Sequence, residues 1–334
     1  MKRVSGIIFM ATMLMVCRSL DAQLATEADR RLHDMLRDWV FFLASDEMGG
    51  RANGSPQMKI AADFIASVFS NAGLKPGFGD SYIRGYTLTS RNRTLEEQNV
   101  AAIIPGSDPV LKDEYIILTA HFDHIGIGRP VEGDSIYNGA DDNAAGTATL
   151  MAIASRIMEK GVRPGRTLVF VAVSGEEMGM RGSRNFVADP PVDLKKAYVN
   201  LNFEMPGYNK NIGKKKFYIT GESQTNIDDL IRSFSHPSGW ELYSLYENAE
   251  RLFSSSDNVA FNTVERRGEI SAGIPSTTLC THTGEDHLHK PWDEPQHIDY
   301  ENMTDFVNWV TDFVVWLSRS KEEIVWTNPS YVRY

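Results

Sequence analysis

Cysteine is almost absent from this sequence. The 334 residues contain two cysteines, Cys17 and Cys280. If the N-terminal segment is removed, Cys280 has no internal partner, so disulfides do not hold the fold together even in an oxidising compartment. The apolar run Val4–Val16 is too short to span a bilayer comfortably. The chain also lacks a proline- or serine-rich linker, a repeat period and low-complexity tracts, which predicts one domain over residues 23–334.

Positive charge is also in deficit. The chain has 34 Lys and Arg against 44 Asp and Glu, a formal net charge of −10. The first 22 residues carry a net charge of +2, so their removal leaves −12. This balance argues against nucleic acid or an anionic membrane surface as a partner. An acidic surface favours cationic ligands, such as the free amine of a peptide.

The N-terminal segment has the pattern of an export signal. Two basic residues precede the apolar run, and Ala22 ends a short segment that suits signal-peptide cleavage. We therefore expect residues 1–22 to be a signal peptide. The protein is then exported to the periplasm or the extracellular space, without stable membrane insertion afterwards. Val16 fits the small-residue motif of bacterial lipoproteins poorly, so lipid anchoring through Cys17 is the less favoured alternative.

Alternating strand and helix patterns predict the fold class. Short β-branched and apolar runs indicate buried strands, and longer stretches with apolar residues at helical spacing indicate helices. The predicted strands are Tyr82–Thr89, Asn99–Ile104, Glu114–Thr119, Arg166–Ser174, Tyr198–Phe203 and Ile274–Cys280. The predicted helices are Glu27–Ala44, Gln57–Ala72 and Asn143–Lys160. This alternation implies an α/β protein with a largely parallel sheet covered on both faces.

Three polar or glycine-rich stretches are predicted to be turns or loops. Asp46–Gly54 is rich in glycine but lacks the spacing of a phosphate-binding loop, so a turn is the default interpretation. Arg91–Glu97 is charged and separates the first two strands, which then form a hairpin-like pair. Asn262–Ala272 is predicted to be a charged surface loop, and a role in shaping a substrate pocket is the alternative.

The stretch Ala120–Gly146 carries the first candidate functional residues. His121 and Asp123 follow the strand Glu114–Thr119, and Asp142 comes just before a predicted helix. In open α/β sheets, ligands bind at the carboxyl ends of the strands, where His121 and Asp123 are expected to lie. A histidine, a carboxylate two residues on and another carboxylate at a helix start resemble one half of a metal site. The alternative is a polar loop that caps the strand and the helix.

Carboxylates also follow the ends of two later strands. Glu176 and Glu177 come after Arg166–Ser174, and Glu204 comes after Tyr198–Phe203. Two adjacent carboxylates at the end of a buried strand are costly unless positive charge lies there. A metal ion would pair with one of them and leave the other free for proton transfer.

Histidines gather after the last predicted strand. His282, His287 and His289 fall within eight residues. An isolated histidine here would indicate a solvated loop, but three after a strand end favour a ligand among them.

These motifs, in this order, resemble the co-catalytic zinc aminopeptidases. Their clan also contains aminopeptidase Y, bacterial leucyl aminopeptidases, glutamate carboxypeptidase and glutaminyl cyclase. The motifs are Ala-His-Phe-Asp-His, Gly-Ala-Asp-Asp-Asn-Ala-Ala-Gly, Ser-Gly-Glu-Glu-Met-Gly, Asn-Phe-Glu-Met, Ser256-Asp257 and His289-Lys-Pro-Trp-Asp293. The match runs from the loop Asp46–Gly54 to a closing helix, Asn302–Leu317. It implies a three-layer α-β-α sandwich around a mixed, largely parallel sheet, the zinc exopeptidase fold.

The resemblance also implies a set of metal ligands. Asp142 would bridge two Zn²⁺ ions, which Co²⁺ or Mn²⁺ can replace. His121 and Glu204 would complete the ligands of one ion, and Glu177 and His289 those of the other. The family more often has Asp where this chain has Glu204, whose longer side chain can still reach a metal.

The activity that the resemblance implies is hydrolysis of the N-terminal bond of a peptide with a free N-terminus. Glu176 would be the general base toward a metal-activated water. Asp123 would not bind metal itself but would orient the His121 ring and raise its basicity as a ligand. One alternative is a glutaminyl cyclase with one zinc ion, and another is a non-catalytic relative used for binding. Asn143–Gly146 and Leu288 stand where the cyclase branch has Ser-Ala-Val-Pro and Trp, which favours the peptidase. Carboxypeptidase or dipeptidase specificity and the oligomeric state stay open.

Overall fold

The computed structural model describes residues 26–90, 93–244, 249–264, 273–284 and 286–328. The predicted signal peptide, residues 1–22, lies outside these described residues, and so do residues 265–272 of the predicted surface loop. Within the described ranges, no helix has both the length and the apolar character needed to cross a membrane.

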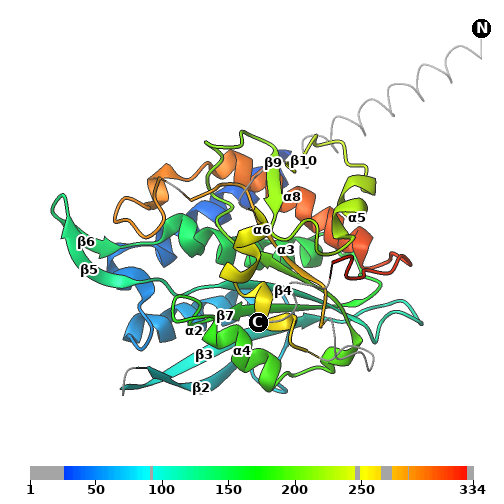
Figure 1. The fold of residues 1–334 in the computed structure, drawn as a ribbon, viewed down its shortest axis with the longest axis horizontal. Helices are drawn as coiled ribbons and strands as arrows, with labels where there is room; N and C mark the ends of the chain where they lie inside the picture. The colour runs from blue at the N-terminus through cyan, green and yellow to red at the C-terminus, as the bar shows by residue number, and fades with distance from the viewer. Residues whose placement is uncertain (1–25, 91–92, 245–248, 265–272, 285, 329–334) are drawn as a thin grey trace, which may run out of the picture.

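Within the described residues, a nine-stranded mixed sheet forms the middle layer of the molecule (Figure 1). The strand order is β1-β3-β7-β4-β8-β11-β9-β10, with β2 paired to β3. The central strands β7, β4, β8 and β11 run parallel, and both flanks contain antiparallel pairs. The strands are β1 Lys75–Pro76, β2 Ile83–Ser90, β3 Arg93–Ile104, β4 Tyr115–His121, β7 Thr167–Val173, β8 Ala197–Phe203, β9 Lys216–Ile219, β10 Glu241–Leu242 and β11 Ser276–Cys280.

Helices cover both faces of this sheet. Side chains of β4 alternate between two apolar clusters: Ile116 and Leu118 pack on one face, and Ile117 packs on the other. The first face is covered by residues 26–43, α2 Pro56–Asn71, α3 Gly146–Glu159 and α8 Tyr300–Leu317. The second face is covered by α4 Arg181–Ala188 and α7 Asn258–Phe261. This arrangement confirms the predicted three-layer α-β-α class.

Smaller elements complete the fold. β5 Gly126–Val131 and β6 Asp134–Tyr137 form a separate hairpin that projects from one end of the molecule (Figure 1). The remaining short helices are α5 Ile227–Ser233 and α6 Ala249–Leu252. A tight 3-10 segment, Asp46–Arg51, occupies the predicted glycine-rich turn.

Two predicted boundaries are wrong. Strand β3 begins at Arg93, so most of the charged stretch that was expected to be a turn is strand. β2 and β3 pair as antiparallel strands, starting with Ser90 opposite Arg93. The backbone groups of the charged stretch form the hydrogen bonds of this pair, and charged side chains do not prevent them. Helix α3 begins at Gly146 rather than Asn143, because Asp142 and Asn143 adopt non-helical conformations in the preceding turn.

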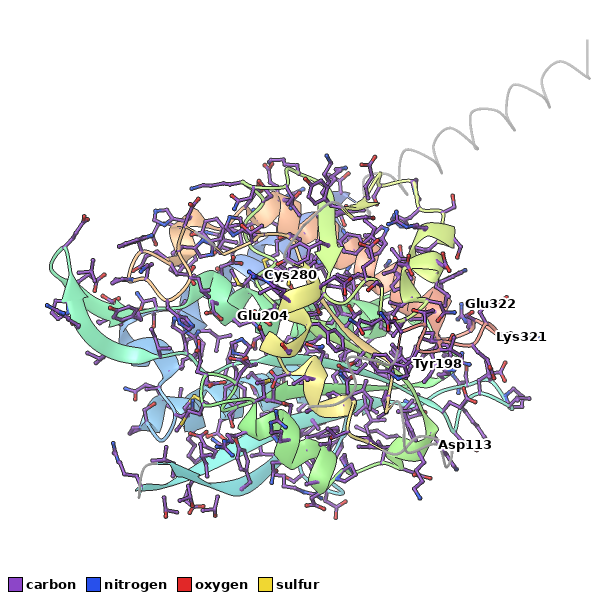
Figure 2. The ribbon with its side chains drawn as sticks, viewed as in Figure 1. Asp113, Tyr198, Glu204, Cys280, Lys321 and Glu322 are labelled. Atoms are coloured by element: carbon purple, nitrogen blue, oxygen red, sulfur yellow. The ribbon has the colours of Figure 1, made fainter. Side chains whose placement is uncertain are left out.

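The chain reverses its direction across the sheet at β4. After β4 the chain enters β7 on one side, and it then crosses to β8 on the other side. Such a switch point opens a crevice at the carboxyl ends of the strands. In Figure 2, Tyr198 at the start of β8 lies away from Glu204, which follows its end, and Cys280 at the end of β11 lies near Glu204.

Candidate metal centre

Four parallel strands and one turn bring their polar side chains to a single edge of the sheet. His121 ends β4, Glu177 follows β7, Glu204 follows β8 and His289 lies in the segment after β11. Asp142 comes from the turn before α3. The structure brings all five of these predicted ligands together in two overlapping groups.

Asp142 lies at the centre of these groups. Its Oδ1 is 3.5 Å from Nε2 of His121, and its Oδ2 is 3.3 Å from Nε2 of His289 and 3.6 Å from Nδ1 of His124. Burial raises the pKa of the Asp142 carboxyl, and the three surrounding histidines lower it by more than burial raises it. The net pKa of this carboxyl therefore lies below its usual value. Each carboxylate oxygen therefore faces a different set of nitrogen atoms.

The two groups share this aspartate. The four-residue group consists of His124, Asp142, Glu177 and His289, and the three-residue group consists of His121, Asp142 and Glu204. Within each group the potential ligand atoms all lie within 4.8 Å of one another. Glu177 joins the first group through oxygens 3.0 Å from His124 Nδ1 and 3.0 Å from His289 Nε2.

Unpartnered buried nitrogens show that these side chains fit a metal ion. Among the described residues, Nε2 of His121 and both ring nitrogens of His124 are buried without a hydrogen-bond partner. Leaving a buried polar atom unsatisfied costs about 1–3 kcal/mol. Imidazole nitrogens with carboxylate oxygens are a donor set that zinc accepts. A divalent cation would accept the lone pair of one nitrogen from each of these rings and would neutralise the surrounding carboxylates.

Glu176 and Glu177 are neighbours in sequence but have different surroundings. Burial raises the pKa of the Glu176 carboxyl well above its usual value, His121 opposes this and Glu204 adds to it. Glu204 itself has its pKa raised to about 7, mainly by burial. Glu176 therefore lies beside the three-residue group, while Glu177 belongs to the four-residue group.

Asp123 connects the ends of two strands. Its carboxylate accepts the backbone N–H groups of Glu176 and Glu177 at 3.2 and 3.3 Å, and the side-chain amide of Asn53 at 2.7 Å. The Nδ1 atom of His121 lies 3.2 Å from the backbone oxygen of Asp123 and 3.7 Å from its carboxylate. The backbone oxygen is therefore the nearer acceptor for His121, and the carboxylate fixes the turn that carries the two glutamates.

Arg51 is a buried cation beneath the site that sequence reasoning missed. Its guanidinium donates to the backbone oxygens of Phe122 at 2.8 Å, Asn138 at 2.8 Å and Gly139 at 2.9 Å. Burial lowers its pKa to about 10, and the nearby Asp293 and Asp123 oppose that shift. Arg51 thus ties the end of β4 to the loop that leads to Asp142.

Two of the three clustered histidines do not reach Asp142. Nε2 of His287 lies 2.9 Å from Oδ2 of Asp141, and His282 lies in the same buried group. The carboxylate of Asp293 accepts the backbone N–H groups of Asp141 and Asp142 at 2.9 and 3.0 Å. These residues support the turn on which Asp142 lies, and His289 alone of the three joins the predicted ligands.

Two hollows flank the cluster. A cavity of about 170 Å³ is bounded by Glu176, Glu204 and His289, and its wall includes apolar side chains. These are Met205, Tyr218, Leu252, Cys280 and Leu288. A wider hollow of about 620 Å³ is lined by His124 and Glu177 together with Asn53 and Leu95. The cluster therefore borders both a small, partly apolar cavity and a larger, more open hollow, and Glu177 lines both of them.

His124 is the second residue that sequence reasoning missed. It closes the motif Ala-His-Phe-Asp-His, so its presence was visible, but the sequence alone gives no direction for its ring. Arg51 carried a weaker signal, because an arginine in a glycine-rich turn is usually exposed.

Comparisons with known proteins identify the family of this chain. A sequence model of peptidase family M28 matches residues 99–314. Leucine aminopeptidase 1 of Trichophyton equinum is 26% identical over 241 residues, which cover 70% of this chain and 62% of that protein. Aminopeptidase YwaD of Bacillus subtilis is 25% identical over 240 residues, covering 69% of this chain and 48% of that protein. The chain thus spans between about half and two thirds of the length of these relatives.

Solved structures share the fold. BSAP, a zinc aminopeptidase from Bacillus subtilis, superposes with a TM-score of 0.62 at 17% identity, covering 86% of this chain and 96% of that one. Glutaminyl cyclase from Porphyromonas gingivalis gives a TM-score of 0.59 at 18% identity, covering 84% of this chain and 97% of that one. At these identities the likeness concerns the fold alone. The match of the family model over most of the chain shows that the protein belongs to peptidase family M28.

Proposed function

We propose that this protein is a zinc-dependent aminopeptidase that releases N-terminal residues from peptides with a free amine. The observation that carries the proposal is the position of Asp142, which directs one oxygen to His121 and the other to His124 and His289. A carboxylate that serves two ligand groups suits a bridging role between two ions, which lie about 3.5–4 Å apart in such pairs. The aminopeptidase relatives in the family support the same activity.

The ligands divide between the two ions as the two groups do. His121 and Glu204 would hold one zinc ion with Asp142, and Glu177 and His289 would hold the other with Asp142. When bound, zinc supplies Lewis-acid chemistry that lowers the pKa of a water molecule and polarises a carbonyl oxygen. The side chain of Glu204 is longer than that of the Asp usual in the family, and its carboxylate still lies within the three-residue group with His121 and Asp142. This position supports its role as a ligand.

Glu176 is the proposed general base. Both glutamates border the small cavity, but the oxygens of Glu177 lie 3.0 Å from two histidine nitrogens and belong to the four-residue group. Glu176 takes a proton from the attacking water as the water oxygen bonds to the scissile carbonyl carbon. It then gives that proton to the amine nitrogen as the C–N bond breaks. Proton transfer of this kind contributes about 10²–10⁴ in rate.

The small cavity supports the substrate class. Its apolar wall, which includes Leu252 and Leu288, suits an aliphatic N-terminal side chain such as leucine. The carboxylates around it attract the ammonium group of a free N-terminus. The names of the fungal relatives, leucine aminopeptidases, agree with this preference.

A peptide panel tests the proposed activity. We expect the zinc-restored enzyme to release leucine from a free leucyl peptide, and the metal-stripped enzyme to release none. The N-acetylated form of the same peptide serves as the control and should not be cut. Release of residues from the C-terminus, or equal cleavage of the acetylated peptide, would overturn the aminopeptidase assignment. Conversion of an N-terminal glutaminyl peptide to pyroglutamate, identified by mass, would support the cyclase alternative.

We also propose that the protein is exported after removal of residues 1–22. The basic start and short apolar run of the sequence support this. N-terminal sequencing of the protein from its native host should give Gln23 or a close neighbour. A retained Met1 or a lipidated Cys17 would contradict soluble export.

A further inference from the structure

His124 is held rigidly beside the metal ligands. Its backbone N–H donates to the oxygen of Arg51 at 3.1 Å, which fixes the chain at this point. Gly139 makes room for the ring, because a Cβ atom there would lie 2.5 Å from Cγ of His124. The side chain is fully buried. Its orientation toward the cluster is therefore imposed by the surrounding backbone.

The distances within the four-residue group match those of ligands around one ion. His124 Nδ1 lies 3.0 Å from Glu177 Oε1 and 3.6 Å from Asp142 Oδ2. His289 Nε2 lies 3.0 Å from Glu177 and 3.3 Å from Asp142. Four ligand atoms bonded to a tetrahedral zinc at about 2.0–2.2 Å are about 3.3–3.6 Å apart. The observed spacing is close to this range without any rearrangement.

His124 does not behave as a hydrogen-bond donor to its neighbours. Although Nδ1 is 3.0 Å from a Glu177 oxygen, it is not oriented to donate a hydrogen bond to it. Nε2 is also unpartnered among the described residues. A lone pair on Nδ1 directed into the space between Glu177, Asp142 and His289 explains the first observation, since that space is where a shared cation would lie, and the proton of the neutral ring is then on Nε2.

We propose that His124 is a metal ligand, binding through Nδ1 the ion that Asp142, Glu177 and His289 hold. The inference rests on the proposed function, which supplies the two ions. It gives one ion four protein ligands and leaves the other with three. Four protein ligands are typical of closed zinc sites, while catalytic sites keep an open position. The two ions are therefore unequal: the four-ligand ion binds more tightly, and the open position lies at the three-residue group.

The two hollows distinguish His124 from the other ligands of its group. The small cavity is lined by Glu176 and Glu204, and also by Asp142, Glu177 and His289 of the four-residue group. Among the described residues, its walls do not include His124, which lines the wider hollow instead. The proposed base and the open position thus face the substrate cavity, and His124 binds its ion from outside that cavity.

Zinc titration against a competing chelator tests the inequality. We expect wild-type apoprotein to bind two ions with different affinities, and His124→Ala to weaken only the tighter site, by about 100-fold or more. Unchanged affinities at both sites in a folded His124→Ala protein would overturn the inference. A wild type that binds fewer than two ions would instead count against the proposed function.

Cobalt spectroscopy separates a ligand from a residue that only positions Glu177. With Co²⁺ bound, His124→Cys should gain a thiolate-to-metal charge-transfer band in the near ultraviolet. His236→Cys is the control, a partly buried histidine that belongs to none of the candidate metal-binding groups of the described residues, and should show no such band. A Co²⁺-loaded His124→Cys protein without the band would overturn the proposal.

NMR spectroscopy of the wild-type protein tests the same proposal without depending on the folding of a variant. His121 and His289 face Asp142 through Nε2, whereas His124 faces it through Nδ1. Binding of one equivalent of ¹¹³Cd²⁺ should therefore produce one histidine coupled to the metal through Nδ1 in ¹⁵N spectra. Coupling through Nε2 alone would contradict the inference.

Discussion

Two neighbouring aspartates, Asp141 and Asp142, each lie among histidines, and yet their surroundings differ. Asp141 groups with the buried His282 and His287, and Asp142 groups with the buried His121 and His124 and with the exposed His289. Both carboxylates lie where nearly all solvent is excluded. The difference is in where the lone pairs of the histidine nitrogens are used.

Around Asp141 the lone pairs are already engaged. A backbone N–H donates to His282 Nδ1 at 2.8 Å, so neutral His282 carries its proton on Nε2 and has no lone pair left there. His287 Nε2 is hydrogen-bonded to Asp141, whose other oxygen accepts the N–H of Gly207 at 2.7 Å. Around Asp142 the nitrogens of His121 and His124 that face the carboxylate have no hydrogen-bond partner among the described residues. Buried histidines beside an aspartate are thus common to both groups, and free lone pairs distinguish a ligand group from a structural one.

The substitution Asp142→Asn is expected to have the largest effect on metal binding and activity. We expect the variant to fold but to lose both metal ions and all measurable peptidase activity, because the two ions share this carboxylate. Metal analysis of the purified variant checks the first expectation and a leucyl peptide assay the second. If Asp142→Asn retained two ions, the bridging role would be wrong.

A smaller effect is expected from Glu176→Gln. The variant should keep its metal content and melting temperature, while kcat falls by about 10²–10⁴-fold, because only the proton carrier is lost. Glu177→Gln is the matched comparison and should lose metal first, with activity falling as a consequence. A fully active Glu176→Gln enzyme would end the proposed mechanism. A loss of stability without a loss of kcat would make Glu176 a structural residue instead.

The smallest effect on metal content and kcat is expected from Asp141→Asn, which is the matched control for Asp142→Asn. Its carboxylate holds His287 and the Gly207 backbone, so its replacement should cost about 1–3 kcal/mol of unfolding free energy. Both metal ions should remain, with kcat changed less than in Glu176→Gln. Chemical denaturation and metal analysis measure the two quantities. Loss of metal equal to that of Asp142→Asn would erase the distinction between the two groups.

Much of the fold follows from local patterns in the sequence. The strand around Ile116–Ala120 and the apolar strand Leu168–Val173 are buried on both faces, so their composition alone identifies them. The start of β3 did not follow, because its charged residues resemble a turn until β2 pairs with them. Pairing between segments supplies hydrogen bonds that no local propensity contains.

The sequence also placed the carboxylates and histidines at one edge. Strands that run parallel end on the same side, so His121, Glu177 and Glu204 were expected to meet there, as they do. The change from the family's usual Asp to Glu204 was visible from the sequence as well. Whether the longer side chain still reaches its group depended on the backbone around it.

What the sequence by itself determined is the order of strands and helices, and with it the edge where the polar residues gather. Only the tertiary structure decided which histidines direct free nitrogens toward Asp142. His124 and His282 are the same residue type in similar polar loops, but the ring of the first is aimed by Arg51 and Gly139, and the second is engaged by a backbone N–H. The partners of His124 come from segments distant in sequence. The direction of a side chain therefore appears only when the fold brings those segments together.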